Sequence, residues 1–389
     1  MSVNNRKNTI YADHAATSPL LSEALEAMLP FLKENFGNPS SLYGRGVKIR
    51  HAVEEARAII ADCIHTRRNE IIFTSGGTES DNWALEGVCK ALKNKGKHIV
   101  VSSIEHHAIL NTCAALEAEG FEVTYLPVDA NGMVALSDLE RSLREDTVLV
   151  SIMLANNEIG TIQDIKAMAA VAHGHGVLFH TDAVQAVGHI PVNVKRLGVD
   201  LMSASAHKFN GPQGCGFLYV KHGTPIKPFH HGGQQETGLR AGTENVAGIV
   251  GMAVALQYHI NNMRESEKRL KEMAKTFKAI VSDSIPQAVF NGGCRKRLPG
   301  HVSVSFPGRD GEALLHLLDL KGICVSTGAA CNSRSTEVSH VLQAIGLQVD
   351  AAKGTLRVTF GHGNTVHDAE TVANTLVELL MKVMLNAEC

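Results

Sequence analysis

The chain has 389 residues, of which 44% are hydrophobic and 20% charged, and its formal net charge is −2 at pH 7. This length exceeds that of a typical domain of about 100–200 residues, so it favours two domains of ordinary soluble composition. The near-neutral charge predicts no direct binding to nucleic acid or to an anionic membrane. No run approaches the roughly 18 apolar residues of a membrane span, and no apolar signal segment opens the chain, so we expect a cytoplasmic protein.

Between about residues 70 and 220, short β-rich segments alternate with helical patterns, which is typical of βαβ units around a mainly parallel sheet. The expected strands cover residues 70–74, 98–102, 122–128, 147–154, 177–182, 200–205 and 216–220. Helical patterns lie between most of them, for example at 81–94, 108–119 and 165–173. The sequence therefore predicts an α/β fold with a large, doubly wound domain.

The pattern changes in the C-terminal part of the chain. A long helical pattern from about residue 243 to 284 is followed by expected strands at 301–306 and 355–360, a helix at 312–320 and a terminal helix from 366. These elements fit a smaller α+β domain. We expect residues 18–260 to form the large domain, and residues 1–17 with 261–389 to form the small one.

Lys208 lies in the segment SASAHKFNGP, directly after an expected buried strand. A lysine is almost never fully buried without a partner, because removing water from an ammonium group costs several kcal/mol. Lys208 therefore either reaches solvent from the strand end or has a chemical role. Ligands of open α/β sheets bind outside the carboxyl ends of the strands, so residues at the other strand ends decide between these interpretations.

Two other strand ends carry groups that could share a ligand with this lysine. SGGTES places Gly77 and Thr78 at an expected helix N-terminus, which favours a phosphate, and TDAVQ places Asp182 and Gln185 at the same edge. Each group alone could be only a turn, a helix cap or a solvated side chain. Together they indicate a ligand with a phosphate, a basic nitrogen and an aldehyde, which is the chemistry of pyridoxal 5′-phosphate.

Seven motifs, in this order along the chain, resemble those of the cysteine desulfurases: TSGGTES, EHHAI, NNEIG, HTDAVQ, SASAHKFNGP, RAGTEN and STGAACNS. These enzymes use pyridoxal phosphate and belong to fold type I and aminotransferase class V. The resemblance covers nearly the whole chain, and the segment around STGAAC is similar to the family's long-loop branch. The resemblance implies a homodimer that converts L-cysteine to L-alanine and passes the sulfur to a protein acceptor. Iron–sulfur cluster assembly, tRNA thiolation and sulfur modification of DNA all stay open as the use of that sulfur.

The resemblance also assigns roles to single positions. Lys208 matches the lysine that binds the cofactor aldehyde, Asp182 the carboxylate beside the ring nitrogen, and His106 the histidine that stacks on the ring and can exchange protons. Arg357 is expected to hold the substrate carboxylate, unless it is a solvated strand arginine. The remaining implied positions are Gly77, Thr78, Ser205 and His207 at the phosphate, Gln185 and Asn157 at the ring oxygen side and near the substrate, and Thr243, which reaches the phosphate of the neighbouring subunit.

Two positions depart from the family pattern. Ala206 stands where the family often has glycine, and His362 stands where it often has arginine. Neither change removes a catalytic functional group. The alanine would be strained only if position 206 needs a positive φ.

The eight cysteines contain no CxxC pair, and the histidine pairs accompany no HExxH motif, so neither a disulfide framework nor a metal site is predicted. Cys331 alone lies in a Gly-, Ala- and Ser-rich segment without apolar periodicity, which is typical of an exposed loop. It is the predicted nucleophile that takes the sulfur as a persulfide. Cys63, Cys89 and Cys113 are expected in the core, and Cys324 in a strand with an inert thiol.

Two rival interpretations of the sequence stay open. A selenocysteine lyase, or another class V aminotransferase-like enzyme, would keep every cofactor residue and differ in its use of Cys331. A non-catalytic scaffold would keep the fold but would have no physical need for Lys208, Asp182, His106 or Arg357. Activity on L-cysteine separates the first rival from a desulfurase, and a yellow colour in the pure protein argues against the second.

Overall fold

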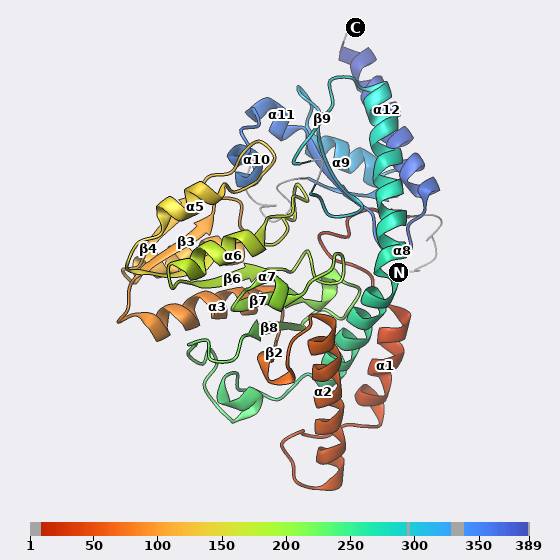
Figure 1. Cartoon of the computed structure of the whole chain (residues 1–389). Helices are drawn as coiled ribbons and strands as arrows, with labels where there is room; N and C mark the ends of the chain where they lie inside the picture. Colours follow the sequence, from red (N-terminus) through yellow and green to blue (C-terminus); the bar gives the residue numbers. More distant parts are fainter. Residues whose placement is uncertain (1–8, 294–295, 328–337, 388–389) are drawn as a thin grey trace.

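The computed structural model describes residues 9–293, 296–327 and 338–387 (Figure 1). Its largest sheet has seven strands in the order β2-β8-β7-β6-β5-β3-β4. Strand β8 pairs antiparallel with both of its neighbours, and all other pairs in this sheet are parallel. The strands are β2 (Ile71–Thr74), β3 (His98–Ser102), β4 (Glu122–Leu126), β5 (Thr147–Ser151), β6 (Leu178–Asp182), β7 (Leu201–Ser205) and β8 (Gly216–Val220).

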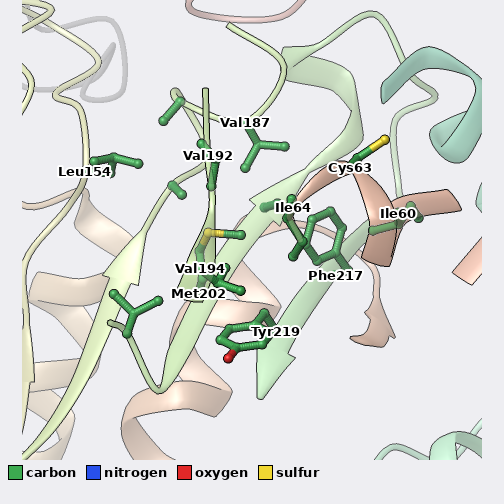
Figure 2. Packing of buried hydrophobic residues seen from close by; sticks show 14 of the residues in the cluster. Ile60, Cys63, Ile64, Leu154, Val187, Val192, Val194, Met202, Phe217 and Tyr219 are labelled. Carbon is green, nitrogen blue, oxygen red and sulfur yellow. The ribbon is translucent and has the colours of Figure 1, made fainter. Parts of the chain in front are cut away.

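Helices cover both faces of this sheet because its strands are apolar on both sides. Phe73 of β2 belongs to the core beneath α2 and α6, whereas Ile72 belongs to the core beneath α3 and α4. Figure 2 shows Ile60 of α2 packed close to Phe217 of β8. The helices of this part are α2 (Gly44–Cys63), α3 (Gly77–Leu92), α4 (His107–Ala118), α5 (Leu136–Ser142), α6 (Ile165–Gly174) and α7 (Val194–Leu197). The predicted doubly wound, mainly parallel sheet is confirmed.

A second, antiparallel sheet has the strand order β12-β13-β10-β9. Its strands are β9 (Val289–Phe290), β10 (His301–Ser305), β12 (Ser326–Thr327) and β13 (Thr355–Thr359), and β1 (Ile10–Tyr11) pairs with β11 (Ile323–Cys324) beside it. The helices of this part are α9 (Gly311–Asp319), α10 (His340–Ala344), α11 (Val349–Lys353) and α12 (Val366–Ala387). These elements match the predicted α+β part of the chain.

Helix α8 (Val246–Ser284) connects the two parts and packs against α1 (Ser22–Lys33), α2 and α12 (Figure 1). Its N-terminal half buries Met252 and Leu256 in the core of the large sheet, and its C-terminal half buries Met273 and Phe277 in the core of the small sheet. One helix therefore fixes the position of one sheet against the other. Among the described residues, no helix is both long enough and apolar enough to cross a membrane.

The sequence did not predict the short 3-10 helices. These are η1 (Arg68–Glu70), η2 (Ala206–Lys208) and η3 (Gln235–Gly238). Ala206 begins η2 and is not among the described non-glycine residues with positive φ, which are His65, Asn210, Glu236 and Thr237. Alanine therefore fits at position 206 without the strain that a positive φ would cause.

Candidate active site

A cavity of about 320 Å³ lies at the carboxyl ends of β6 and β7, and this volume is within the range of small-molecule sites. Ten residues that the sequence assigned to the site line it: Gly77, Thr78, His106, Asn157, Asp182, Gln185, Ser205, His207, Lys208 and Arg357. The other lining residues are Ala15, Ala16, Asp81, Met153 and Val184. Most of the predicted residues therefore lie together where ligands of open α/β sheets bind, at the carboxyl ends of the strands.

Lys208 follows β7 directly in η2, and its amine lines the cavity. The Nζ atom donates hydrogen bonds to the carbonyl oxygens of Ala15, at 2.7 Å, and of Ala16, at 2.8 Å. The Ser18 hydroxyl donates to the carbonyl of His207 at 2.6 Å, which ties the same N-terminal segment to the backbone beside the lysine. The lysine is thus held inside the site by the backbone of a segment that lies almost two hundred residues earlier.

Asp182 is the last residue of β6 and is buried beside the same cavity. Its Oδ1 accepts a hydrogen bond from the backbone N–H of Val184 at 2.8 Å. Burial raises the pKa of this carboxyl to about 6, while the Val184 N–H and the charge of Lys208 act in the opposite direction. At neutral pH the group is an anion, which can accept a hydrogen bond from a protonated ring nitrogen.

The start of α3 forms the anion-binding side of the cavity. The first N–H groups of a helix have no partner within the helix, and the dipole there favours negative charge. A Cβ atom on Gly77 would lie 2.6 Å from Cγ2 of Val184, so the close approach of these segments requires glycine. Glu79, which also lies in the first turn, is paired with Arg240 at 2.8 Å. The backbone amides of this turn can therefore bind a phosphate.

His106 is the N-cap of α4, and its Nδ1 accepts the backbone N–H of Ala108 at 3.1 Å. Burial lowers the pKa of His106 to about 4, with a further contribution from the charge of Lys208. The ring is therefore neutral at pH 7 and carries its proton on Nε2. Burial likewise lowers the pKa of His207 to about 4, and the Nδ1 of this ring lies 3.0 Å from the Thr17 hydroxyl.

Arg357 lies in β13 of the small sheet and is buried, so the interpretation of this residue as a solvated strand arginine is wrong. Its Nη1 donates to the carbonyl of Asn157 at 3.0 Å, and its Nη2 donates to Oδ1 of Asp13 at 2.9 Å. Burial raises the pKa of Asp13, and the guanidinium of Arg357 counteracts this rise. The guanidinium is thus fixed in orientation where it lines the cavity.

Of the predicted site residues that the structure describes, Thr243 does not line this cavity and is exposed to solvent in the single chain. Cys331 lies outside the described residues. The described cysteines all have free thiols, and burial raises the pKa of each: Cys63, Cys89, Cys113, Cys215 and Cys324. A raised pKa keeps a thiol protonated and a poor nucleophile. The described residues contain no group of three or more side chains that could hold a metal ion.

The sequence did not predict four polar groups around the cavity. Asp13 and the carbonyls of Ala15 and Ala16 come from the N-terminal segment, which has no strand or helix periodicity to place it. Asp81 comes from α3, one helical turn after Gly77 and on the buried side. The helical spacing from Gly77 to Asp81 was the available signal, because residues four apart lie on the same face of a helix.

The described residues fit pyridoxal phosphate by their chemistry. One cavity contains an amine for an aldehyde, a buried carboxylate for a ring nitrogen, and the open N-terminus of a helix for a phosphate. The close approach at Gly77 leaves backbone instead of side chain at the phosphate end. These three groups are also those that the sequence led us to expect.

The chain is similar to known proteins over most of its length. The model of the family aminotransferase class V matches residues 10–372. The chain is 50% identical over 382 residues to the cysteine desulfurase IscS of Methanosarcina thermophila, and the match covers 98% of this chain and 94% of the relative.

Two solved structures are also similar to this chain. A NifS-like protein has a TM-score of 0.91 and 38% identity, covering 96% of this chain and 100% of its own. A protein named SspA, solved in complex with cysteine, has a TM-score of 0.80 and 36% identity, covering 90% of this chain and 99% of its own.

Proposed function

The chain belongs to aminotransferase class V and, within it, to the cysteine desulfurase family, and we propose that it converts L-cysteine to L-alanine with pyridoxal phosphate as cofactor. The observation that carries this proposal is the convergence of Lys208, Asp182 and the start of α3 on one cavity. Arg357 adds a fixed cation for the carboxylate of an amino acid to the same cavity. The proposed sulfur acceptor within the chain is Cys331.

The cofactor would be held at three points. The amides of Gly77 and Thr78, with the side chains of Ser205 and His207, would bind its phosphate, and Asp182 would accept the ring N–H. His106 would lie against the ring, and Gln185 and Asn157 would lie near its oxygen and the substrate. When bound, pyridoxal phosphate supplies an aldehyde for the substrate amine and a protonated ring that stabilises the electron pair left on Cα.

The residues of the chain would then position the substrate and move its protons. Arg357 is pre-oriented by Asp13 and by the carbonyl of Asn157, so it can bind the substrate carboxylate without losing side-chain entropy at that moment. Lys208, once its amine is free, takes the proton from Cα. The neutral His106 ring, with its proton on Nε2, can donate this proton and later regain one.

The sulfur is transferred by the thiolate of Cys331. The thiolate attacks the sulfur of the substrate, so one sulfur–sulfur bond forms and the carbon–sulfur bond breaks with its electron pair left on carbon. That carbon takes up a proton, which balances the proton lost by the Cys331 thiol. The products are L-alanine and a persulfide on Cys331, which passes its outer sulfur to a protein acceptor.

We further propose that the enzyme works as a homodimer in the cytoplasm. Thr243 is exposed and outside the cavity of its own chain, so it is available to reach the phosphate site of a partner. Large apolar side chains near α1 and α2 are also exposed, including Phe36 at 65% and Leu42 at 89%, and a partner would cover them. The division of α8 between two cores supports domains formed by 18–260 and by 1–17 with 261–389.

The test is the mass of the purified, cofactor-loaded protein after treatment with L-cysteine in the absence of reductant. The proposal predicts one added sulfur atom, mapped by peptides to Cys331 and removed by a thiol reductant. Lys208→Ala should remain unlabelled, and Cys324→Ser should label like the wild-type protein because Cys324 has a protonated, partly buried thiol. Bound cofactor without any added sulfur would contradict the role of Cys331 and would favour a selenocysteine lyase or another class V enzyme.

A further inference from the structure

A second buried acid, Asp81, lines the same cavity as Asp182, and the proposed mechanism does not use it. Its side chain comes from α3, one turn after Gly77, and only 1% of the residue's surface is exposed. Its Oδ1 atom has no hydrogen-bond partner among the described residues. A buried polar atom without a partner is rare in a folded protein, so this one calls for an explanation.

Within the described part of the chain, no neighbour gives Asp81 a positive charge. Its Oδ1 lies 3.8 Å from Nε2 of His180, but His180 is buried, and its pKa is lowered to about 3 by that burial, so the ring is neutral. The two nitrogens of His180 are engaged with Ser151 at 2.8 Å and with Ser203 at 3.0 Å. Glu105, from the segment after β3, is a third buried acid nearby, and burial raises its pKa to about 8.

The two aspartates at the cavity differ in what stabilises a negative charge. Asp182 accepts a hydrogen bond from the backbone N–H of Val184 at 2.8 Å, and the positive charge of Lys208 lowers its pKa. Among the described residues no backbone N–H donates to Asp81. Burial and then the charge of Asp182 raise its pKa well above the ordinary value, although a hydrogen bond with the Ser203 side chain acts in the opposite direction. Two adjacent buried carboxylates cannot both ionise without a large cost in free energy. The proton is therefore expected on Asp81, whose negative charge has fewer stabilising neighbours than that of Asp182.

We propose that Asp81 is a positioning residue for the cofactor: it keeps a proton, so the single negative charge of the acid pair lies on Asp182, which faces the ring nitrogen. This inference rests on the proposed function, because it needs the ring nitrogen of pyridoxal phosphate. Helix α3 thereby acts on both ends of the cofactor. Its first turn would bind the phosphate, and Asp81, one turn later, would keep the negative charge on the carboxylate that faces the ring nitrogen.

The test uses pyridoxine 5′-phosphate, which has the ring nitrogen and the phosphate but no aldehyde, so it cannot react with Lys208. Its dissociation constant is measured by calorimetry with the cofactor-free protein and three variants. Asp81→Asn keeps a neutral group of the same shape, so we expect an affinity within about threefold of the wild-type value. Asp182→Asn removes the charge at the ring nitrogen, so we expect at least about tenfold weaker binding. Glu105→Gln, an equally buried acid outside the lining, is the matched control and should bind like the wild-type protein.

Infrared difference spectra of the same complexes give a readout that a merely structural role would not change. Because Glu105 also keeps a proton, the protonated-carboxyl absorption of the wild-type protein should lose one component in Asp81→Asn and a different component in Glu105→Gln, and should lose none in Asp182→Asn. If Asp81→Asn does not fold, Asp81→Ser supplies the same comparison with a smaller neutral group.

The possible failures of this test are distinguishable. If Asp81→Asn binds as weakly as Asp182→Asn and loses no protonated-carboxyl band, Asp81 carries the charge and the inference is overturned. If the wild-type protein itself does not bind pyridoxine 5′-phosphate, the proposed function fails before any variant is compared.

Discussion

The two ends of the cavity are built in different ways. At the cofactor end, Gly77, Asp182 and Lys208 lie at or just after the ends of strands of one sheet, so the regular spacing of that sheet sets their positions. At the substrate end, Arg357 comes from the small sheet and Asp13 from the N-terminal segment. The two ends are joined by the carbonyls of Ala15 and Ala16, which hold the Lys208 amine.

This difference shows how one chain divides two tasks. In the proposed function the cofactor would stay bound over many reactions, and a rigid, buried sheet edge suits a group that does not leave. The substrate must enter and its product must leave, and its binding group lies on a second sheet that α8 connects to the first. Burial raises the pKa of acids at both ends, but Asp13 at the substrate end is paired with the Arg357 guanidinium, whereas Asp81 and Asp182 at the cofactor end lie side by side in the lining of the cavity.

The largest expected effect comes from His106, at the cofactor end. His106→Asn keeps a side chain that is favourable as the N-cap of α4 but removes the ring. We expect kcat for alanine formation to fall by about 10²–10⁴-fold, the usual contribution of a positioned acid or base, with little change in thermal stability. His107→Gln is the matched control, because His107 is adjacent but does not line the cavity. Equal losses in both variants would contradict the role of His106.

The next effect tests the substrate end. Arg357→Lys keeps a positive charge for Asp13 but loses the fixed, planar arrangement of donors. We expect KM for L-cysteine to rise at least about tenfold while cofactor affinity stays within about twofold. Arg357→Gln also leaves Asp13 without its partner, so the free energy of unfolding should fall by about 3 kcal/mol. A change in cofactor affinity as large as the change in KM would show that the two ends are not separate.

The free energy of unfolding of the cofactor-free protein should depend on pH, with opposite contributions from the buried histidines and the buried acids. Burial lowers the pKa of six described histidines to about 3 or about 4. Between about pH 4 and pH 6.5 the folded state therefore binds fewer protons than the unfolded state, so these histidines make the free energy of unfolding rise with pH. Burial raises the pKa of Asp182 to about 6, of Glu158 to about 7 and of Glu105 to about 8, so these acids lower stability as pH rises to about 8. The six histidines are His14, His106, His180, His207, His259 and His301.

Because the histidines outnumber these acids, we expect maximal stability near pH 6.5 and lower values at pH 5 and pH 8. Urea unfolding at these three values measures the profile. Glu105→Gln should remove part of the decline between pH 6.5 and 8, because that acid releases its proton in this interval. A steady rise to pH 8 in the wild-type protein would show that the acids do not keep their protons.

The smallest effect concerns the turn before Lys208. Ala206 is fully buried, so Ala206→Gly removes a packed methyl group and adds freedom to the unfolded chain, which should cost about 1 kcal/mol of stability. Gly44→Ala is a control of opposite sign, because nothing lies near its Cβ position and alanine reduces unfolded-state freedom. A stabilised Ala206→Gly variant would mean that the alanine strains η2.

The cofactor end could largely be predicted from the sequence, whereas only Arg357 and Asn157 of the substrate end were predicted. Asp182 ends one strand and Lys208 follows another, so the rule that ligands bind at strand ends predicts that they lie together. Asp13 pairs with a residue 344 positions away, in a segment without periodicity, and no local pattern indicates such a contact. Arg357 had two interpretations because an arginine in a strand is usually solvated, and its burial became clear only from the packing of the two sheets.

Asp81 was missed for a related reason. A charged residue in a helical pattern is normally assigned to the solvent side, since ionised carboxylates are rarely buried. The structure places it on the buried side, facing the sheet, where a neutral acid costs much less than an ionised one. The residue type alone therefore predicts the wrong face when the protonation state differs from the ordinary one.

The central claim is that Lys208 binds the aldehyde of pyridoxal phosphate in this cavity. The most direct measurement is borohydride reduction of the purified, cofactor-loaded protein, followed by peptide mass mapping. The account predicts a phosphopyridoxyl group on Lys208 alone, with no label on Lys221, a lysine on the surface whose amine is paired with Asp200. A label on other lysines without Lys208, or no label at all in a protein that contains the cofactor, would contradict it.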